Sequence, residues 1–314
     1  MKRKSCGFLT AGLRLFFLVL CIGFPPQSPL ADQQAADGVD TLNHRLAIEA
    51  WRTARHERLK QPDGWLTLVG LEWLNEGENR IGKAQDNDIQ LSGGPDYWGT
   101  VTLQEDRLSF TNIDPKEVKV NGESIESTTL VADIEGEPTV ISAGTMSINV
   151  IFRESYALRI KDSQAEALQN FKGVDNYPID ESWRISSRFI AAPEGTVMEI
   201  TNVLGQVFES PVFGTFEFER DGKTHSMQGL GTGESETLWF IFADRTTGHG
   251  SYGAGRYLYS DGMPESGVLT VDFNKAYNPP CAFNEYSTCP IPPQQNRMDV
   301  WVESGEKDYH PDVD

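Results

Sequence analysis

From Trp65 onward, hydrophobic and polar residues alternate in short runs that glycine, asparagine, aspartate and proline separate. Such runs, at a spacing of about 8–12 residues, are typical of strands in β-sandwiches and barrels. Asn121-Gly122, between two such runs, predicts a tight hairpin turn, because both residues tolerate positive φ. The pattern predicts a mainly β protein, with one β-sandwich over residues 64–163 and a second sandwich-like or barrel-like β domain over residues 164–314.

One stretch before the strands has helical spacing. Apolar residues recur every three to four positions between Leu42 and Gln61, and basic residues crowd the other face and the end of the stretch. Cations near a helix C-terminus are favoured by the helix dipole. The Pro62-Asp63-Gly64 sequence would end the helix. Residues 32–40 are polar, and we expect a disordered leader there, so residues 32–63 are predicted to hold a leader and one amphipathic helix.

The first 31 residues have the features of a secretory signal peptide. Basic residues at positions 2–4 precede an apolar run over residues 15–24, which prolines follow. A membrane-spanning helix needs about 20 apolar residues, and this run is shorter. We therefore expect a cleaved signal peptide at residues 1–31, no stable membrane insertion after its removal, and a periplasmic or extracellular location.

The charge balance argues against several classes of partner. The formal net charge is −19, and loss of residues 1–31 would remove four basic and no acidic residues, which changes −19 to −23. Proteins that bind nucleic acid or anionic membranes need a basic patch. We therefore expect no nucleic-acid partner, and a small molecule is the partner that the sequence leaves open. No cofactor or metal motif stands out, so we expect neither.

Residues 272–297 form the most unusual segment of the chain. Five prolines exclude a helix, and cysteines, aromatic residues, asparagines and aspartate lie between them. A long loop inside a compact domain is often functional. We interpret this segment as a rigid loop that presents polar groups. Its candidate acid or base is Asp272, and its candidate ligand-binding residues are Asn274, Asn278, Asn296 and Arg297.

The loop also holds Cys281 and Cys289. An even pair of cysteines in an exported protein favours a disulfide. A metal site that uses both thiolates is less favoured, because the loop contains no histidine. Alternatively, Cys281 could act as a nucleophile, which would require a lowered thiol pKa; His249 is the nearest candidate to lower it.

A second candidate segment, residues 244–259, follows a continuous apolar run that predicts a buried central strand. Polar side chains lie there among several glycines, which let a loop approach a ligand closely. A competing interpretation is a wide hairpin in which Asp244 and Arg256 only bridge the strands. The candidate catalytic residues are Asp244 and His249, and the candidate ligand-binding residues are Thr246, Tyr252 and Arg256.

The sequences of these two segments resemble a known family. DRTTGHGSYGAGRYLY, followed by VDFNKAYNPPCAFNEYSTCPIPPQQNRMDVWVESGEK, is similar to the bacterial and archaeal domain of unknown function 1684, as is FKGVDNYPIDESWRISSRF upstream. The resemblance extends over residues 42–309. It implies a mostly β fold and no established activity, and it supplies no catalytic or binding residues.

The first β domain resembles a forkhead-associated sandwich. IGKAQDNDIQL and the later VNG are similar to that family's motifs. The family's phosphothreonine site needs an arginine where Lys83 stands and a serine–histidine pair where residues 96–99 stand. A phosphate dianion needs a dense cluster of donors. The resemblance therefore implies a sandwich fold without phosphopeptide binding.

Three functions remain open. We favour an exported, hydrolase-like enzyme that acts on a small anionic or polar substrate at the 244–259 and 272–297 loops. Its acid and base would be aspartates, and its arginines would hold an anionic group. The alternatives are a non-catalytic β module that binds a small ligand, and a structural or interaction protein whose polar loop residues only satisfy backbone groups. Side chains that converge on one cavity would favour a site, whereas backbone partners would favour the structural role.

Overall fold

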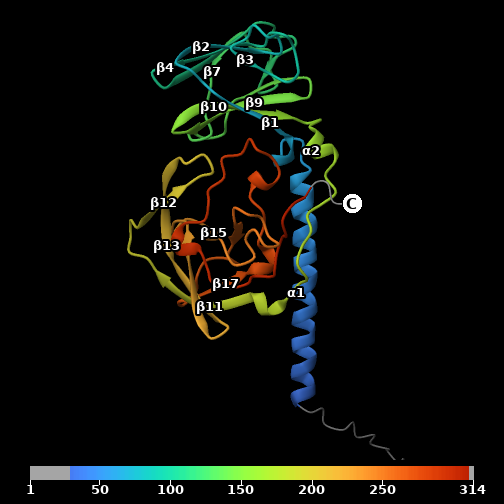
Figure 1. Ribbon diagram of the computed structural model, residues 1–314, viewed down its shortest axis with the longest axis vertical. Helices are drawn as coiled ribbons and strands as arrows, with labels where there is room; N and C mark the ends of the chain where they lie inside the picture. Colours follow the sequence, from blue (N-terminus) through green and yellow to red (C-terminus); the bar gives the residue numbers. More distant parts are fainter. Residues whose placement is uncertain (1–28, 311–314) are drawn as a thin grey trace, which may run out of the picture. The chain divides into compact units, whose positions relative to one another are not determined.

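The computed structural model describes residues 29–310, with side chains described from Asp40 onward, and it confirms a mainly β protein with one long N-terminal helix (Figure 1). The chain divides into two units between Leu42 and Asn43, and all features described below except the first part of the N-terminal helix lie in the second. Among the described residues, no helix is long and apolar enough to span a membrane. Most of the predicted signal peptide, residues 1–28, lies outside the described part.

The helix α1 (Pro29–Leu59) begins earlier than the sequence predicts. Residues 32–40 are helical rather than a disordered leader, and they continue without a break into the predicted helix. The face of α1 that packs inward is partly polar, since Arg55 is 8% exposed whereas Leu46 is 59% exposed. Arg55 Nε donates to Glu306 Oε1 at 3.0 Å, and Arg52 Nη2 donates to the carbonyl of Tyr177 at 2.9 Å.

The first β domain is a sandwich of two five-stranded sheets, with the orders β1-β10-β9-β8-β6 and β3-β2-β4-β5-β7. Both sheets contribute to one core, in which Trp98 and Phe110 are fully buried. Asn121 and Gly122 have φ values of 50° and 81°, which confirms the predicted tight turn. The strands are β1 (Leu68–Trp73), β2 (Gly77–Gly82), β3 (Ile89–Gln90), β4 (Gly99–Gln104), β5 (Arg107–Asn112), β6 (Lys119–Val120), β7 (Ser127–Thr129), β8 (Val140–Ala143), β9 (Met146–Arg153) and β10 (Ser155–Asp162).

The second β domain contains one seven-stranded sheet, in the order β16-β15-β14-β13-β11-β17, with β12 paired to β13. An isolated bridge between Ser260 and Val271 links the two end strands, so the sheet curls toward a barrel. The predicted central strand is β15, whose Phe240 and Phe242 are fully buried. The strands are β11 (Arg184–Ala191), β12 (Val197–Thr201), β13 (Val207–Arg220), β14 (Lys223–Leu230), β15 (Trp239–Phe242), β16 (Arg256–Tyr259) and β17 (Val268–Asp272).

Short helical turns connect these strands and shape the loops. The loop over residues 272–297 contains three of them, which is consistent with a rigid, proline-rich segment rather than a long helix. The turns are η1 (Trp65–Thr67), α2 (Glu166–Gln169), η2 (Glu181–Trp183), η3 (Phe273–Lys275), η4 (Pro280–Ala282) and η5 (Gln294–Asn296).

Candidate functional site

Asp244 and Arg256 form a buried ion pair that connects parts of the fold. Both side chains are fully buried, and Arg256 Nη2 lies 2.9 Å from Asp244 Oδ2. The guanidinium also donates to three carbonyl groups of the C-terminal segment, at 2.9, 2.5 and 3.2 Å, which belong to Val302, Ser304 and Glu306. The pair therefore fastens this segment to the ends of β15 and β16.

Both carboxylate oxygens of Asp272 also have hydrogen-bond partners within the protein. Its Oδ2 lies 2.7 Å from Nε2 of His44 on α1, and its Oδ1 accepts hydrogen bonds from the backbone and side-chain nitrogens of Asn274. Asn274 Oδ1 in turn accepts from the backbone N–H of Asp180 at 3.0 Å and from Ser304 Oγ at 2.9 Å. Both residues are fully buried. They connect α1, the start of η2 and the C-terminal segment.

The remaining asparagines bond to backbone groups. Asn278 Nδ2 donates to the carbonyl of Lys307 at 2.7 Å. Asn296 Oδ1 accepts from the backbone N–H of Gln228 at 2.7 Å, and its Nδ2 donates to the carbonyls of Gln228 and Ile241 at 3.0 Å. Asparagine often takes such a role in irregular loops. For these residues, the structure corresponds to the structural alternative.

Of the other candidates, Thr246 joins the Asp244–Arg256 pair, since Arg256 Nη2 donates to Thr246 Oγ1 at 3.3 Å and the backbone N–H of Thr246 donates to Asp244 Oδ1 at 2.7 Å. His249 and Arg297 are exposed, and His249 Nδ1 contacts the carbonyl of Thr247. Thr246 Oγ1 bonds to the buried hydroxyl of Ser251. The hydroxyl of Tyr252 donates to the carbonyl of Cys281 at 3.0 Å.

Cys281 and Cys289 form a disulfide. The prediction of Cys281 as a catalytic nucleophile is therefore wrong for this structure, because a disulfide sulfur carries no thiolate. The bond closes the segment that holds Ser287 and Thr288. The loop of residues 272–297 is thus fixed by a covalent link as well as by hydrogen bonds.

Breaking this disulfide should lower the free energy of unfolding by about 2–3 kcal/mol, because the link restricts a short loop in the unfolded chain. Urea unfolding of the wild type with and without reductant measures the effect. The Cys281→Ser/Cys289→Ser double variant is the control, and it should match the reduced wild type and ignore the reductant. A wild type whose unfolding midpoint is the same under both conditions would contradict this expectation.

A cavity of about 320 Å³, here called the arginine cavity, lies beside the disulfide loop. Residues of α1, β9, β10, β15, β16 and the loop of residues 272–297 meet there. Three arginines and five large aromatic residues dominate its walls. Its lining residues are Arg55, Trp65, Arg153, Arg159, Trp239, Tyr257, Tyr259, Tyr277, Pro280, Ser287, Thr288, Cys289 and Pro290.

Arg159, on β10, is the unusual member of this set. It is 9% exposed, its Nε has no hydrogen-bond partner, and no carboxylate within residues 29–310 forms an ion pair with it. Its guanidinium carbon lies 5.3 Å from the ring centre of Trp65, within cation–π range. Burial, and after it the charge of Arg153, lowers the pKa of Arg159 to about 10. At neutral pH this side chain is therefore a buried cation without a counter-ion.

The other two arginines of the cavity are neutralised. Arg153 Nη2 lies 2.9 Å from Asp133 Oδ2, and Arg153 Nε donates to Thr288 Oγ1 at 3.2 Å. Arg55 forms its ion pair with Glu306. The arginine cavity therefore carries one uncompensated positive charge, at Arg159.

Aromatic rings form much of the remaining wall of the arginine cavity. Trp239 and Tyr257 make an edge contact with ring centres 5.0 Å apart, and Tyr259 stacks on Tyr277 at 6.2 Å. Burial raises the pKa of both Tyr257 and Tyr277 well above the usual range of tyrosine. These hydroxyl groups stay neutral, so the wall adds no negative charge to balance Arg159.

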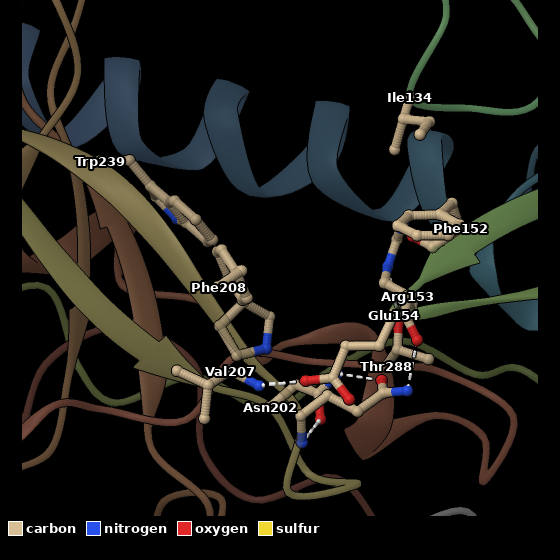
Figure 2. A pocket seen from close by; sticks show the side chains of 11 residues that line it. Ile134, Phe152, Arg153, Glu154, Asn202, Val207, Phe208, Trp239 and Thr288 are labelled. Atoms are coloured by element: carbon tan, nitrogen blue, oxygen red, sulfur yellow. Dashed lines mark hydrogen bonds between the residues drawn. The ribbon is translucent and has the colours of Figure 1, made fainter.

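A second cavity of about 510 Å³, here called the apolar cavity, adjoins the first. The two share the lining residues Arg153, Trp239, Thr288 and Pro290. Figure 2 shows Trp239 and Phe208 on one side of the apolar cavity and Phe152 and Ile134 on the other, with the polar groups gathered at one end. Its remaining lining residues are Glu154, Asn202, Gln206 and Val207.

Sequence reasoning missed the residues of both cavities. Both predicted loops contribute to the arginine cavity, but through Tyr257, Tyr259 and the segment 277–290. None of the predicted catalytic or ligand-binding residues lines either cavity. One signal was available, because Arg159 interrupts the apolar run of YALRI, in which every residue is buried. A charged residue inside such a strand is uncommon unless it is paired.

Comparisons with known proteins find a matching family model for part of the chain. Residues 169–307 match the model of a family described as a protein of unknown function (DUF1684). The match covers the second β domain and is narrower than the resemblance over residues 42–309. The solution NMR structure of an uncharacterised protein of Haloarcula marismortui is 28% identical, with a TM-score of 0.37, and covers 44% of this chain and 78% of that chain. No curated protein matches the chain.

Proposed function

We propose that this protein, whose residues 169–307 match the model of the DUF1684 family of proteins of unknown function, binds a small anionic molecule in the arginine cavity. Arg159 carries this proposal, because it is buried and unpaired on the wall of a cavity. A buried charge without a partner destabilises a protein by several kcal/mol. A bound anion would supply the missing partner, with hydrogen bonds to the planar guanidinium.

The geometry supports binding over hydrolysis. The serine and threonine hydroxyl groups of the cavity have partners within the protein, since Ser287 Oγ donates to Asn284 Oδ1 at 2.8 Å and Thr288 Oγ1 accepts from Arg153. Neither is bonded to a histidine or carboxylate that could act as its base. Among the described residues, no group of three or more His, Cys, Asp and Glu side chains is placed to hold a metal ion. The non-catalytic alternative therefore fits this cavity better than a hydrolase does.

We also propose that binding takes place outside the cytoplasm. The basic and apolar pattern of residues 1–31 supports export, and the Cys281–Cys289 disulfide suits an oxidising compartment. N-terminal sequencing of the protein from separated cell fractions tests this. Export predicts a chain that starts close to residue 32 in the periplasmic or secreted fraction; an intact chain in the cytoplasm would contradict it.

Fluorescence titration with 8-anilinonaphthalene-1-sulfonate tests the anion site. This probe is a monoanion with an aromatic body, and its emission rises in an apolar site. Arg159→Met should weaken its binding by about 10- to 100-fold, the range expected when a hydrogen bond to a charged group is lost. The control is Arg188→Met, which makes the same change at an exposed arginine paired with Glu217. Equal affinities of the wild type and both variants would overturn the proposal.

The affinity for this probe should fall above about pH 10. Below that pH Arg159 is charged in the free protein; above it, binding must be coupled to proton uptake, so the affinity falls by about tenfold per pH unit. The sulfonate stays ionised, and Tyr257 and Tyr277 remain neutral because burial raises their pKa. In Arg159→Lys the fall should begin at lower pH, since the lysine ammonium has the lower ordinary pKa. A flat profile between pH 8 and 11 would contradict the assignment.

A further inference from the structure

We infer that the ligand is an amphipathic monocarboxylate, with its carboxylate at Arg159 and its apolar body extending past Trp239 into the apolar cavity. This inference rests on the anion binding proposed above and adds a ligand class to it. It depends on the number of free charges in the arginine cavity, on the connection between the two cavities, and on the groups at the polar end of the apolar cavity.

The charge of the arginine cavity fits a monoanion. Arg153 and Arg55 are paired with Asp133 and Glu306, which leaves Arg159 as the one unpaired arginine on the wall. A carboxylate carries one negative charge and matches the guanidinium in shape. A phosphate monoester carries about −1.5 to −2 at neutral pH. Part of that charge would stay uncompensated among aromatic rings, where an unpaired charge is unfavourable.

The connection between the cavities fits an apolar body. Four shared lining residues make the apolar cavity a continuation of the arginine cavity, and Trp239 borders both. Phe208 and Ile134 lie on opposite sides of this space (Figure 2) and are 40% and 58% exposed. The body of a ligand would cover part of this apolar surface. Each methylene group that leaves water for such a site strengthens binding.

The polar end of the apolar cavity disfavours a second anionic group. Glu154 Oε1 accepts from the backbone N–H of Val207 at 2.9 Å, and Gln206 Nε2 donates to the carbonyl of Arg153 at 2.5 Å. Asn202 Nδ2 donates to Gln206 Oε1 at 2.8 Å. These polar groups already have hydrogen-bond partners, and the charged side chain among them is the carboxylate of Glu154. A dicarboxylate would place its second carboxylate near Glu154 without a cation to pair with, and like charges repel.

Displacement of bound 8-anilinonaphthalene-1-sulfonate by straight-chain carboxylates tests the inference. From butanoate to decanoate, each added methylene should tighten binding by about fourfold until the apolar cavity is full. Octanedioate should bind at least about tenfold more weakly than octanoate, because binding would remove its second carboxylate from water without a cation to pair with it. In Phe208→Ser the dependence on chain length should weaken, while butanoate affinity stays as in the wild type. Ile134→Ser provides a second, more exposed site for the same change.

The outcomes separate this inference from the proposed function. If the probe depends on Arg159 but carboxylate affinity does not rise with chain length, or octanedioate binds as well as octanoate, the anion site stands and the ligand class is overturned. If probe binding is the same in the wild type and in Arg159→Met, both are overturned. If chain-length dependence is unchanged in Phe208→Ser and Ile134→Ser, the apolar cavity does not hold the body, and the inference fails.

Discussion

Replacing Arg256 by methionine should lower the free energy of unfolding by about 3–5 kcal/mol, because it leaves Asp244 as an unpaired charge in the interior. Both side chains are fully buried in the structure. The substitution also removes the donors to three carbonyl groups of the segment around Ser304. Urea unfolding followed by circular dichroism measures the loss.

A double variant shows whether the effect comes from the unpaired charge. Asp244→Asn alone should also be strongly destabilised, because Arg256 then loses its counter-ion. Asp244→Leu together with Arg256→Met removes both charges, and its loss should be smaller than the sum of the single losses. A loss below about 1 kcal/mol for Arg256→Met would contradict the structural role. So would undiminished stability combined with lost probe binding, which is the behaviour of a ligand-contacting residue.

Replacing Arg159 by methionine should have the opposite effect and raise the free energy of unfolding at pH 7 by about 1–3 kcal/mol. Burial lowers its pKa from the ordinary value of arginine to about 10 in the folded protein, which corresponds to a penalty of about 3 kcal/mol for the charged form. This penalty is fully present below pH 10 and disappears as the pH rises toward 12.5. The cation–π contact with Trp65 stabilises the wild type by about 1 kcal/mol or more, and this contribution is lost in Arg159→Met.

The two arginines therefore provide a matched comparison. Both are buried, and the same substitution should destabilise the protein at Arg256 and stabilise it at Arg159. Arg188→Met, at an exposed position, should change the stability by less than about 0.5 kcal/mol. Loss of stability in Arg159→Met, of a size similar to that in Arg256→Met, would mean that Arg159 has a structural partner and serves the fold. Residues that weaken stability in the absence of ligand are a common feature of binding sites.

The alternation of apolar and polar residues was sufficient to predict the sheets, because most strands bury one face. It was less reliable at the C-terminal end. Met298, Val300 and Val302 are buried and alternate with exposed residues, but their segment is extended without forming a strand. Its backbone pairs only locally with residues 243–245. Periodicity reports which side chains are buried and does not show whether a neighbouring backbone is available along the whole segment.

The candidate site was harder to predict, for a related reason. Asparagine and aspartate are suited both to ligand binding and to loop backbones, and the choice depends on what lies opposite them. For Asn296 the partners are backbone groups of Gln228 and Ile241, far away in the sequence. The cavity likewise depends on long-range contacts that bring Arg159 and Trp65 beside the disulfide loop. Sequence patterns located the loop of residues 272–297 and could not identify the side chains that it presents to the cavity.

The most direct test of the central claim, that Arg159 is a buried cation whose counter-ion is a ligand, is urea unfolding of the wild type and Arg159→Met with and without 8-anilinonaphthalene-1-sulfonate, followed by circular dichroism. Without the probe, the variant should be the more stable protein. With the probe at 100 times its dissociation constant for the wild type, the wild type should gain about 2.7 kcal/mol, whereas the variant, which binds the probe about 10- to 100-fold more weakly, should gain only about 0.4–1.4 kcal/mol. A variant that is less stable without the probe and gains as much as the wild type with it would contradict the claim.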